Sequence, residues 1–261
     1  MGRIPGLRGA HHWLQSVVRT RATGITESSP RPSGNYAELL FAHEGRQLHK
    51  WLHYCAIYDD LVGPFAHGFP ASGGQRRPVR LLEIGVLHGG SLEVWREYLG
   101  AGAVICGIDI DPRCAEASRA DLMVRIGSQS DEEFLHSVVA EMGGIDIVVD
   151  DGSHIAALQR KSFDVLFPLL SPGGVYIVED THTSYFWSYG GGFRRHGSIV
   201  ETAKRMVDGL HKWHFRTPIG PRGHLASRDV YSIRFYDSVV AFQKAPRGQP
   251  QVGEFGSQTL R

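Results

Sequence analysis

The chain has 261 residues, a formal net charge of +1 at pH 7 and 42% hydrophobic residues. This composition is ordinary for a globular protein with a sizeable core, and its near-zero charge excludes any global reason to expect a nucleic-acid partner. The three cysteines, at 55, 106 and 114, have neither the number of a disulfide scaffold nor the spacing of a zinc site. No apolar run approaches the roughly 20 residues that cross a bilayer. We therefore expect a cytoplasmic protein without a membrane span.

Residues 1–35 are predicted to form a basic arm and linker, partly flexible. The first acidic residue is Glu27, and Pro5 interrupts any apolar stretch that could serve as a signal peptide. Gly6 stands where N-myristoylation needs serine or threonine. Residues 22–35 are rich in Ser, Thr, Pro and Gly, which is typical of a linker. An arm of this kind suits a subunit contact, and we expect a homodimer or a higher homo-oligomer.

Residues 36–78 are predicted to be a helical N-terminal extension followed by a loop. Between residues 36 and 65, apolar side chains recur at helical intervals, including Leu40, Leu48, Leu52 and Leu61. The following stretch, GFPASGGQRRP, carries the glycines and prolines of a loop and ends at Pro78.

From Val79 the pattern changes to short apolar runs alternating with amphipathic segments. This is the rhythm of βαβ units, which dictates a parallel sheet with helices on both faces. The apolar runs are VRLLEI, VICGID, LMVRI, IDIVVD and VYIVED, and a closing DVYSIRFYDSVVAFQK suggests an antiparallel hairpin. The sequence thus predicts an α/β fold with a Rossmann-like, doubly wound, seven-stranded sheet over residues 79–245. The sheet is mostly parallel with an antiparallel C-terminal hairpin strand, and residues 246–261 form a flexible tail.

A sheet of this kind binds ligands at the carboxyl ends of its strands. Carboxylates stand at four of these ends, at Glu83, Asp109, Asp150–Asp151 and Glu179–Asp180. We therefore look for the functional residues at that edge of the sheet.

The first strand runs into E-I-G-V-L-H-G-G-S, residues 83–91. Glycines at this place allow a backbone turn to approach a ligand and open a helix whose N-terminus attracts negative charge. Leu87 occupies the position where a nicotinamide-binding fingerprint needs a second glycine, and no Gly-Lys-Ser/Thr of a P-loop follows. Asp109, at the tip of the next strand, is placed to accept the ribose hydroxyls of a nucleoside. The alternative role of helix cap fits Asp111, before Pro112, better.

Two segments carry the remaining carboxylates, D-D-G-S-H (150–154) and E-D-T-H-T-S-Y (179–185). If their strands are adjacent, Asp151, Glu179 and Asp180 converge, and such close carboxylates require a cation between them. Oxygen ligands favour Mg²⁺, Mn²⁺ or Ca²⁺ over Zn²⁺. The other interpretations are that Asp151 or Ser153 caps the next helix and that the Glu-Asp pair is solvated.

A metal would meet the chemical need of methyl transfer to a hydroxyl. Chelation orients two vicinal hydroxyls and lowers their pKa, and a nearby base then removes the proton. His154, three residues after Asp151, is the candidate base. Asp150 supports either the cofactor loop or the metal ligands from behind.

These motifs resemble those of the class I S-adenosylmethionine methyltransferases. E-I-G-V-L-H-G-G-S corresponds to their first motif, G-I-D-I-D-P to their second, and R-I-G-S-Q-S-D to the stretch that holds the adenine. The resemblance implies S-adenosyl-L-methionine as cofactor. The implied binding residues are Glu83, Gly85, Gly89, Ser91, Asp109, Ser128, Gln129 and Asp150.

The two carboxylate segments further resemble the metal-dependent sugar O-methyltransferases of macrolide and other glycosylated natural-product pathways. The resemblance implies a magnesium site at Asp151, Glu179 and Asp180, with His154 as the base. It also implies a rhamnosyl, mannosyl or related hexosyl acceptor on a glycoside, glycolipid or polysaccharide. The stretch H-K-W-L-H-Y-C-A-I-Y (49–58) resembles the family only loosely, since residues 45–48 read G-R-Q-L where the family has Gly-Thr-Asp-Lys.

The acceptor pocket is predicted to include His182 and Tyr185. The aromatic, glycine-rich loop 184–193 is either a lid that stacks on sugar faces or a surface loop with buried anchors. A catechol-type O-methyltransferase and a non-catalytic binding protein of the same fold are the alternative functions. A base-directed methyltransferase would carry N/D-P-P-Y/F after the fourth strand, where this chain has D-D-G-S-H.

Overall fold

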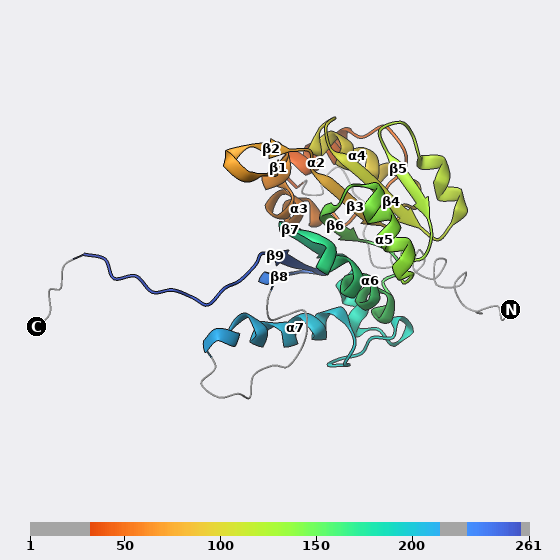
Figure 1. Ribbon diagram of the computed structural model, residues 1–261. Coiled ribbons are helices and arrows are strands. Elements are labelled where there is room, and N and C mark those ends of the chain that lie inside the picture. The colour runs from red at the N-terminus through yellow and green to blue at the C-terminus, as the bar shows by residue number, and fades with distance from the viewer. Residues whose placement is uncertain (1–31, 215–228, 257–261) are drawn as a thin grey trace, which may run out of the picture. The chain divides into compact units, whose positions relative to one another are not determined.

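The computed structural model describes residues 32–214 and 229–256 (Figure 1). The predicted basic arm lies almost entirely outside the described residues, and so does the end of the predicted tail. Residues 246–256 of that tail contain no helix or strand. Within the described ranges, no helix combines the length and hydropathy needed to cross a membrane. The expected homo-oligomer stays a prediction.

A seven-stranded sheet forms the centre of the molecule, in the order β5-β4-β3-β6-β7-β9-β8. Five strands are parallel, and β9 lies antiparallel between β7 and β8. This confirms the predicted sheet, including the hairpin, whose turn is Asp237–Ser238. The strands are β3 (Arg80–Ile84), β4 (Val104–Asp109), β5 (Met123–Ile126), β6 (Ile145–Asp150), β7 (Leu170–Val178), β8 (Val230–Tyr236) and β9 (Val239–Lys244).

Helices cover both faces of the sheet, as the βαβ rhythm requires (Figure 1). Neighbouring residues of one strand serve opposite faces: Leu81 joins one apolar cluster and Leu82 the other. The first cluster includes Trp95 of α4, and the second includes Phe163 of α6. Residues of α2 (Asn35–Ala42), α3 (Tyr54–Leu61) and α4 (Gly90–Leu99) pack in the first cluster. Residues of α5 (Glu132–Glu141), α6 (Ala156–Leu169) and α7 (Ile199–Leu210) pack in the second.

The helical extension differs from the prediction because residues 43–53 lie between α2 and α3 and do not continue either helix. This segment crosses the start of α4. A Cβ atom at Gly90 would lie 2.1 Å from the carbonyl oxygen of Arg46, and the Arg46 amide donates to Glu93 at 2.8 Å. The segment therefore contacts α4 through its backbone at residues 46 and 47.

Two shorter segments also differ from the sequence interpretation. The predicted loop before Pro78 contains a small antiparallel pair, β1 (Phe69–Pro70) and β2 (Arg76–Arg77). Residues 112–117 form a 3-10 helix in place of an amphipathic α-helix, and Asp111 caps it as expected by accepting from the Arg113 amide. All three cysteines are buried and unpaired, which agrees with the absence of a disulfide framework.

Candidate functional site

The carboxyl ends of β3, β6 and β7 lie side by side at one edge of the sheet, and β6 and β7 are adjacent, which is the condition under which the sequence predicts that the aspartates converge. Ile84 pairs with Asp150, and Asp150 pairs with Val178. The loops that follow therefore start as neighbours, and a Cβ atom at Gly85 would lie only 2.3 Å from the carbonyl oxygen of Asp151. The glycine loop and the D-D-G-S-H segment are thus in direct backbone contact.

Asp151, His154 and Asp180 form a group whose ligand atoms all lie within 4.8 Å of one another. The Nε2 atom of His154 lies 3.6 Å from Oδ2 of Asp180 and 4.0 Å from Oδ1 of Asp151. All three side chains are largely buried, and their oxygen-rich donor set suits a hard divalent cation. Burial alone would raise the pKa of Asp180, but His154 and a hydrogen bond from Tyr54 hold it below its usual value.

Each aspartate in this group has one oxygen held by a donor from the N-terminal extension. Oδ2 of Asp151 accepts from Nζ of Lys50 at 2.6 Å. Oδ1 of Asp180 accepts from the hydroxyl of Tyr54 at 2.7 Å. The opposite oxygen of each carboxylate is the one closer to His154. The two carboxylates are therefore oriented with one oxygen each toward the centre of the group.

Glu179, the third predicted metal ligand, is held differently. Its side chain is 1% exposed, and its oxygens accept from Lys50 at 2.9 and 3.1 Å. The hydroxyl of Tyr58 also donates to Oε1. Burial alone would lower the pKa of Lys50. The negative charges of Asp151 and Glu179 outweigh the effect of burial and raise this pKa well above its usual value, so the ammonium stays charged. Lys50 therefore bridges Glu179 and Asp151, and a direct ligand role for Glu179 stays a prediction.

The backbone is unusual at two residues of the group. His154 and Asp180 have φ values of 57° and 50°, in the left-handed region that non-glycine residues rarely adopt. The hydroxyl of Thr183 lies 3.1 Å from the carbonyl oxygen of His154 and 2.8 Å from that of Asp180. Strain of this kind, about 1–3 kcal/mol for each residue, is concentrated at functional sites.

The capping alternative for Asp151 does not hold. Helix α6 begins at Ala156, and its N-cap residue is Ile155, whose side chain makes no capping hydrogen bond. Ser153 accepts from the Ile155 amide at 3.3 Å. Asp151 makes no such contact with the start of α6 and points toward Lys50 and His154.

The predicted cofactor residues of the first motif lie on or under the glycine loop. Gly85 and Gly89 have φ values of 96° and 90°, so the loop uses the freedom that glycine gives. Glu83 is fully buried, accepts from Ser91 at 2.7 Å and lies 3.7 Å from Nζ of Lys50. Burial raises the pKa of Glu83 to about 6. Glu83 and Ser91 therefore shape the loop from beneath.

Asp109 also supports this loop. Its Oδ2 atom accepts from the amides of Val86 at 2.9 Å and Leu87 at 3.3 Å, and its Oδ1 atom accepts from the Asp111 amide at 2.9 Å. The carboxylate is half-buried beside the loop. This arrangement fixes its orientation, and the expected contact with ribose stays a prediction.

Gln129 and Asp150 form a buried polar network behind the site. Nε2 of Gln129 donates to Asp150 at 3.3 Å, and Oε1 accepts from the Ser153 amide at 3.0 Å. Asp150 also accepts from the hydroxyl of Ser162 at 2.6 Å, and burial raises its pKa to about 6. Asp150 thus supports the two loops from behind. The hydroxyl of Ser128 bonds to that of Ser130 at 2.9 Å, and contacts of Ser128 and Gln129 with adenine stay predictions.

The candidate acceptor residues follow β7 in a short 3-10 turn, Thr181–Tyr185. Nδ1 of His182 bonds to the hydroxyl of Ser238 in the β8–β9 turn, and its ring lies edge-on to Trp51 with 6.4 Å between centroids. Burial lowers the pKa of His182. Tyr185 is 44% exposed.

The aromatic loop 184–193 has features of both predicted interpretations. Tyr189 is buried and anchors it, whereas Trp187 and Phe193 are more than three-quarters exposed. The guanidinium of Arg195 lies 5.0 Å from the centre of the Trp187 ring. Exposed aromatic rings are available for stacking, but a lid function stays a prediction.

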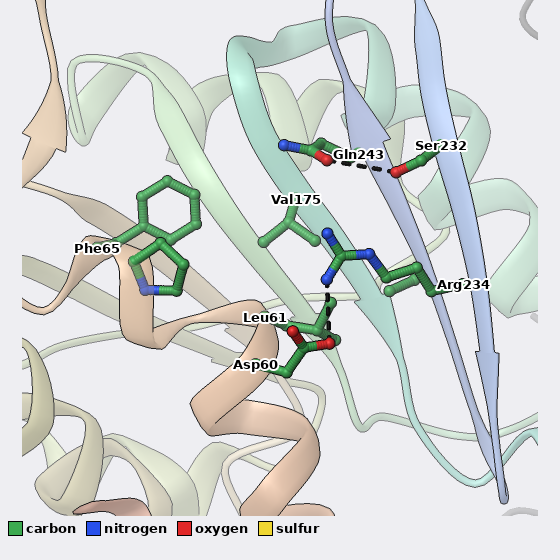
Figure 2. Close-up of a pocket in the computed structure, with 9 residues that line it drawn as sticks. Asp60, Leu61, Phe65, Val175, Ser232, Arg234 and Gln243 are labelled. Atoms are coloured by element: carbon green, nitrogen blue, oxygen red, sulfur yellow. Dashed lines mark hydrogen bonds and ion pairs between the residues drawn. The ribbon is translucent and has the colours of Figure 1, made fainter.

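A pocket of about 380 Å³ lies elsewhere, between the end of α3 and strands β7, β8 and β9 (Figure 2). Arg234 donates to Asp60 at 3.0 Å on its wall, and Ser232 donates to Gln243 at 3.3 Å (Figure 2). None of the predicted site residues lines it. It is therefore separate from the candidate site.

The sequence interpretation missed three donors, Lys50, Tyr54 and Tyr58. Tyr54 and Tyr58 lie four residues apart on one face of α3, whereas Lys50 precedes that helix. The spacing of the two tyrosines is a signal in the sequence, but it does not show that their hydroxyls reach carboxylates. The aromatic rings do pack in the core, while their hydroxyls reach the carboxylates.

Comparisons with known proteins find similarity to methyltransferases. Residues 82–181 match a family model described as a methyltransferase domain. The chain is 42% identical over 217 residues to L-olivosyl-oleandolide 3-O-methyltransferase of Streptomyces antibioticus, covering 79% of this chain and 53% of that protein. It is 35% identical over 205 residues to 8-demethyl-8-alpha-L-rhamnosyl tetracenomycin-C 2'-O-methyltransferase of Streptomyces olivaceus, covering 75% and 51%.

A solved structure of the mycinamycin-pathway methyltransferase MycE in complex with Mg and SAH is also similar. Its TM-score is 0.70 at 26% identity, with 83% of this chain and 56% of that chain covered. The chain spans about half the length of the curated relatives named above.

Proposed function

We infer that this chain is a class I S-adenosylmethionine-dependent methyltransferase, which transfers a methyl group to a hydroxyl of a sugar unit with the help of Mg²⁺. The acceptor class is a rhamnosyl, mannosyl or related hexosyl group of a glycoside. One observation carries the proposal: the Asp151–His154–Asp180 group lies beside the glycine loop, at the edge where this fold binds its ligands. The relatives named above act on sugars attached to natural products, which supports the acceptor class.

The residues fit a divalent metal. Asp151 and Asp180 each present one oxygen to the group, while the other oxygen of each is anchored by a hydrogen bond. Such anchoring is the pattern that outer partners give to metal ligands. Mg²⁺ or Mn²⁺ held there would supply charge that lowers the pKa of a chelated hydroxyl. MycE has been solved with Mg, which agrees with this choice.

His154 is the proposed general base. Its Nε2 atom faces the space between the two aspartates, where an acceptor hydroxyl would be oriented. Its side chain is 9% exposed, so bulk water is largely excluded from the ring. The residue therefore takes up the proton that the acceptor hydroxyl loses as it attacks the donor methyl group.

The donor S-adenosyl-L-methionine is proposed to lie over residues 83–91. The fixed turn at Gly85 and Gly89 provides close backbone approach, and the oriented Asp109 carboxylate is available to the ribose hydroxyls. His182, Tyr185 and the exposed rings of loop 184–193 are proposed to line the acceptor side. Stacking of these rings on sugar faces would orient the acceptor.

The test begins with calorimetric titration of S-adenosylhomocysteine and Mg²⁺ into the wild-type chain, followed by mass spectrometry of methylated products. The acceptor panel contains rhamnosides, mannosides and catechols. We expect methylated rhamnoside or mannoside in the presence of Mg²⁺ and no product in EDTA. Product from catechols alone would overturn the acceptor class, and the absence of S-adenosylhomocysteine binding would overturn the enzyme assignment.

A matched pair of variants tests the metal ligands. Asp180→Asn is expected to weaken Mg²⁺ binding by more than about 100-fold, since a direct ligand contributes more than an outer-shell partner. Asp208→Asn makes the same chemical change at an exposed residue of α7 and should bind Mg²⁺ as the wild type does. Equal Mg²⁺ affinity in both variants would refute the site.

A further inference from the structure

The stretch 50–58 lies outside the part of the chain that matches the methyltransferase domain, residues 82–181, yet it contacts the carboxylates of the proposed metal site. We propose that Tyr54 and Lys50 are positioning residues, which fix the rotation of Asp180 and Asp151 so that one oxygen of each faces the metal. This inference rests on the proposed function. It assigns a role in metal binding to residues far from the methyltransferase motifs in the sequence.

Tyr54 clamps Asp180 at two points. Its hydroxyl donates to Oδ1 of the carboxylate at 2.7 Å and accepts from the Asp180 amide at 3.2 Å. The tyrosine is 1% exposed, so water does not compete for these bonds. The clamp holds the side chain and the left-handed backbone of Asp180 together, with Oδ2 directed at His154.

Lys50 makes the equivalent contact with Asp151 and adds charge. Its side chain is 3% exposed, and its ammonium lies 2.6 Å from Oδ2 of Asp151 and 2.9 Å from Glu179. Glu83, under the cofactor loop, lies 3.7 Å away. One cation therefore touches or adjoins carboxylates from the ends of β3 and β6 and from the loop after β7. It compensates their charge and leaves Oδ1 of Asp151 facing His154.

The helix that carries Tyr54 is itself rigidly held. Asp59, at the other end of α3, accepts from the Tyr36 amide at 3.1 Å and from the hydroxyl of Tyr98 at 2.7 Å. Asp60 pairs with Arg234 of β8 at 3.0 Å. These bonds fix α3 to α2, α4 and the sheet, so the position of the Tyr54 hydroxyl is determined by the fold.

A merely structural role would give a different result. A buried tyrosine hydroxyl bonded to a carboxylate contributes to stability wherever it occurs. A positioning role requires, in addition, that its loss weakens metal binding by about 10–100-fold, the range found for partners of metal ligands. Metal affinity and stability must therefore be measured on the same variants.

Tyr54→Phe and Tyr98→Phe provide the matched comparison. Each variant removes one buried hydroxyl that donates to an aspartate at 2.7 Å, but only Tyr54 contacts the proposed metal site. Mn²⁺ is titrated calorimetrically, without cofactor or acceptor, and thermal unfolding is recorded in EDTA. We expect the Mn²⁺ affinity to fall by about 10-fold in Tyr54→Phe and by less than about 2-fold in Tyr98→Phe. Equal Mn²⁺ affinities in the two variants would overturn the inference.

Lys50→Met and Lys50→Arg test the second positioning residue. We expect Lys50→Met to lower Mn²⁺ affinity by about 10–100-fold, because Asp151 loses the contact that fixes its rotation, and Lys50→Arg to recover part of the loss. Lys244→Met is the control, since Lys244 is also buried but donates to the Pro168 carbonyl oxygen. Tighter Mn²⁺ binding in Lys50→Met would mean that the ammonium competes with the metal, which would overturn the role of Lys50.

The outcomes separate this inference from the function on which it rests. If the wild-type chain binds no Mn²⁺, the proposed metal-dependent function fails. If the wild type binds Mn²⁺ and Tyr54→Phe binds it equally well, only the positioning role fails. Should Lys50→Met not fold, the two tyrosine variants decide alone, because each retains the ring and its packing.

Discussion

Replacing Glu179 by glutamine removes one buried negative charge at nearly constant shape. In the wild type, this carboxylate is 1% exposed and accepts two bonds from Lys50 and one from Tyr58. Removing one partner of a buried ion pair costs about 3–5 kcal/mol. Lys50 keeps its 2.6 Å contact with Asp151 in the variant, so we expect the lower end, about 3 kcal/mol. For a domain of this size, that loss lowers the melting temperature by about 6–12 °C.

The assay is denaturant unfolding with circular dichroism, together with Mn²⁺ titration of the folded variant. Glu141→Gln is the control, because Glu141 pairs with Arg125 on the surface and its loss should leave stability unchanged within error. An unchanged free energy of unfolding in Glu179→Gln would refute the buried pair. The Mn²⁺ titration decides the ligand question: an affinity loss well above 100-fold would make Glu179 a direct ligand, as the sequence predicts.

Three further predictions concern the base, the glycine loop and the pH dependence of stability. His154→Ala should lower kcat by about 10²–10⁴-fold while Mn²⁺ affinity changes less than about 3-fold, and a large loss of Mn²⁺ affinity would make His154 a ligand. In denaturant unfolding, Gly85→Ala should lower the free energy of unfolding by at least about 1 kcal/mol more than Gly100→Ala does. Both glycines have positive φ, but of the two only Gly85 would place a Cβ atom against the backbone of another segment. Equal losses of stability in the two variants would contradict the close approach at Gly85. Burial raises the pKa of Glu83 from its usual 4.5 to about 6, so the folded chain binds a proton that the unfolded chain lacks between these values. Glu83 therefore contributes a fall of about 2 kcal/mol in stability as pH rises through this window, and Glu83→Gln should remove that part of the fall in unfolding curves recorded on both sides of it. Asp150, whose pKa burial also raises to about 6, keeps its own contribution in the variant.

The fold was largely predictable because its signals are local. Runs such as VRLLEI and IDIVVD have the length and β-branched content of buried strands, and the segments between them have the length and pattern of crossover helices. The break between α2 and α3 was not predictable, because residues 43–53 make their contacts with Glu93 and Gly90, which lie far along the chain. Helical periodicity reports which residues are apolar and carries no information about such distant backbone contacts.

The candidate site divides in the same way. The sequence by itself determined that Asp151 and Asp180 lie at the same edge of the sheet, because parallel strands place their carboxyl ends on one edge. The structure added that their strands, β6 and β7, are adjacent. Only the tertiary structure decided how their oxygens are oriented, since Lys50 is 101 residues from Asp151 and Tyr54 is 126 residues from Asp180. Local patterns place a residue at the end of a strand, but strand order depends on tertiary packing, and the direction of these hydrogen bonds depends on the position of α3 over the sheet. That position is fixed by packing among segments whose proximity no short stretch of sequence encodes.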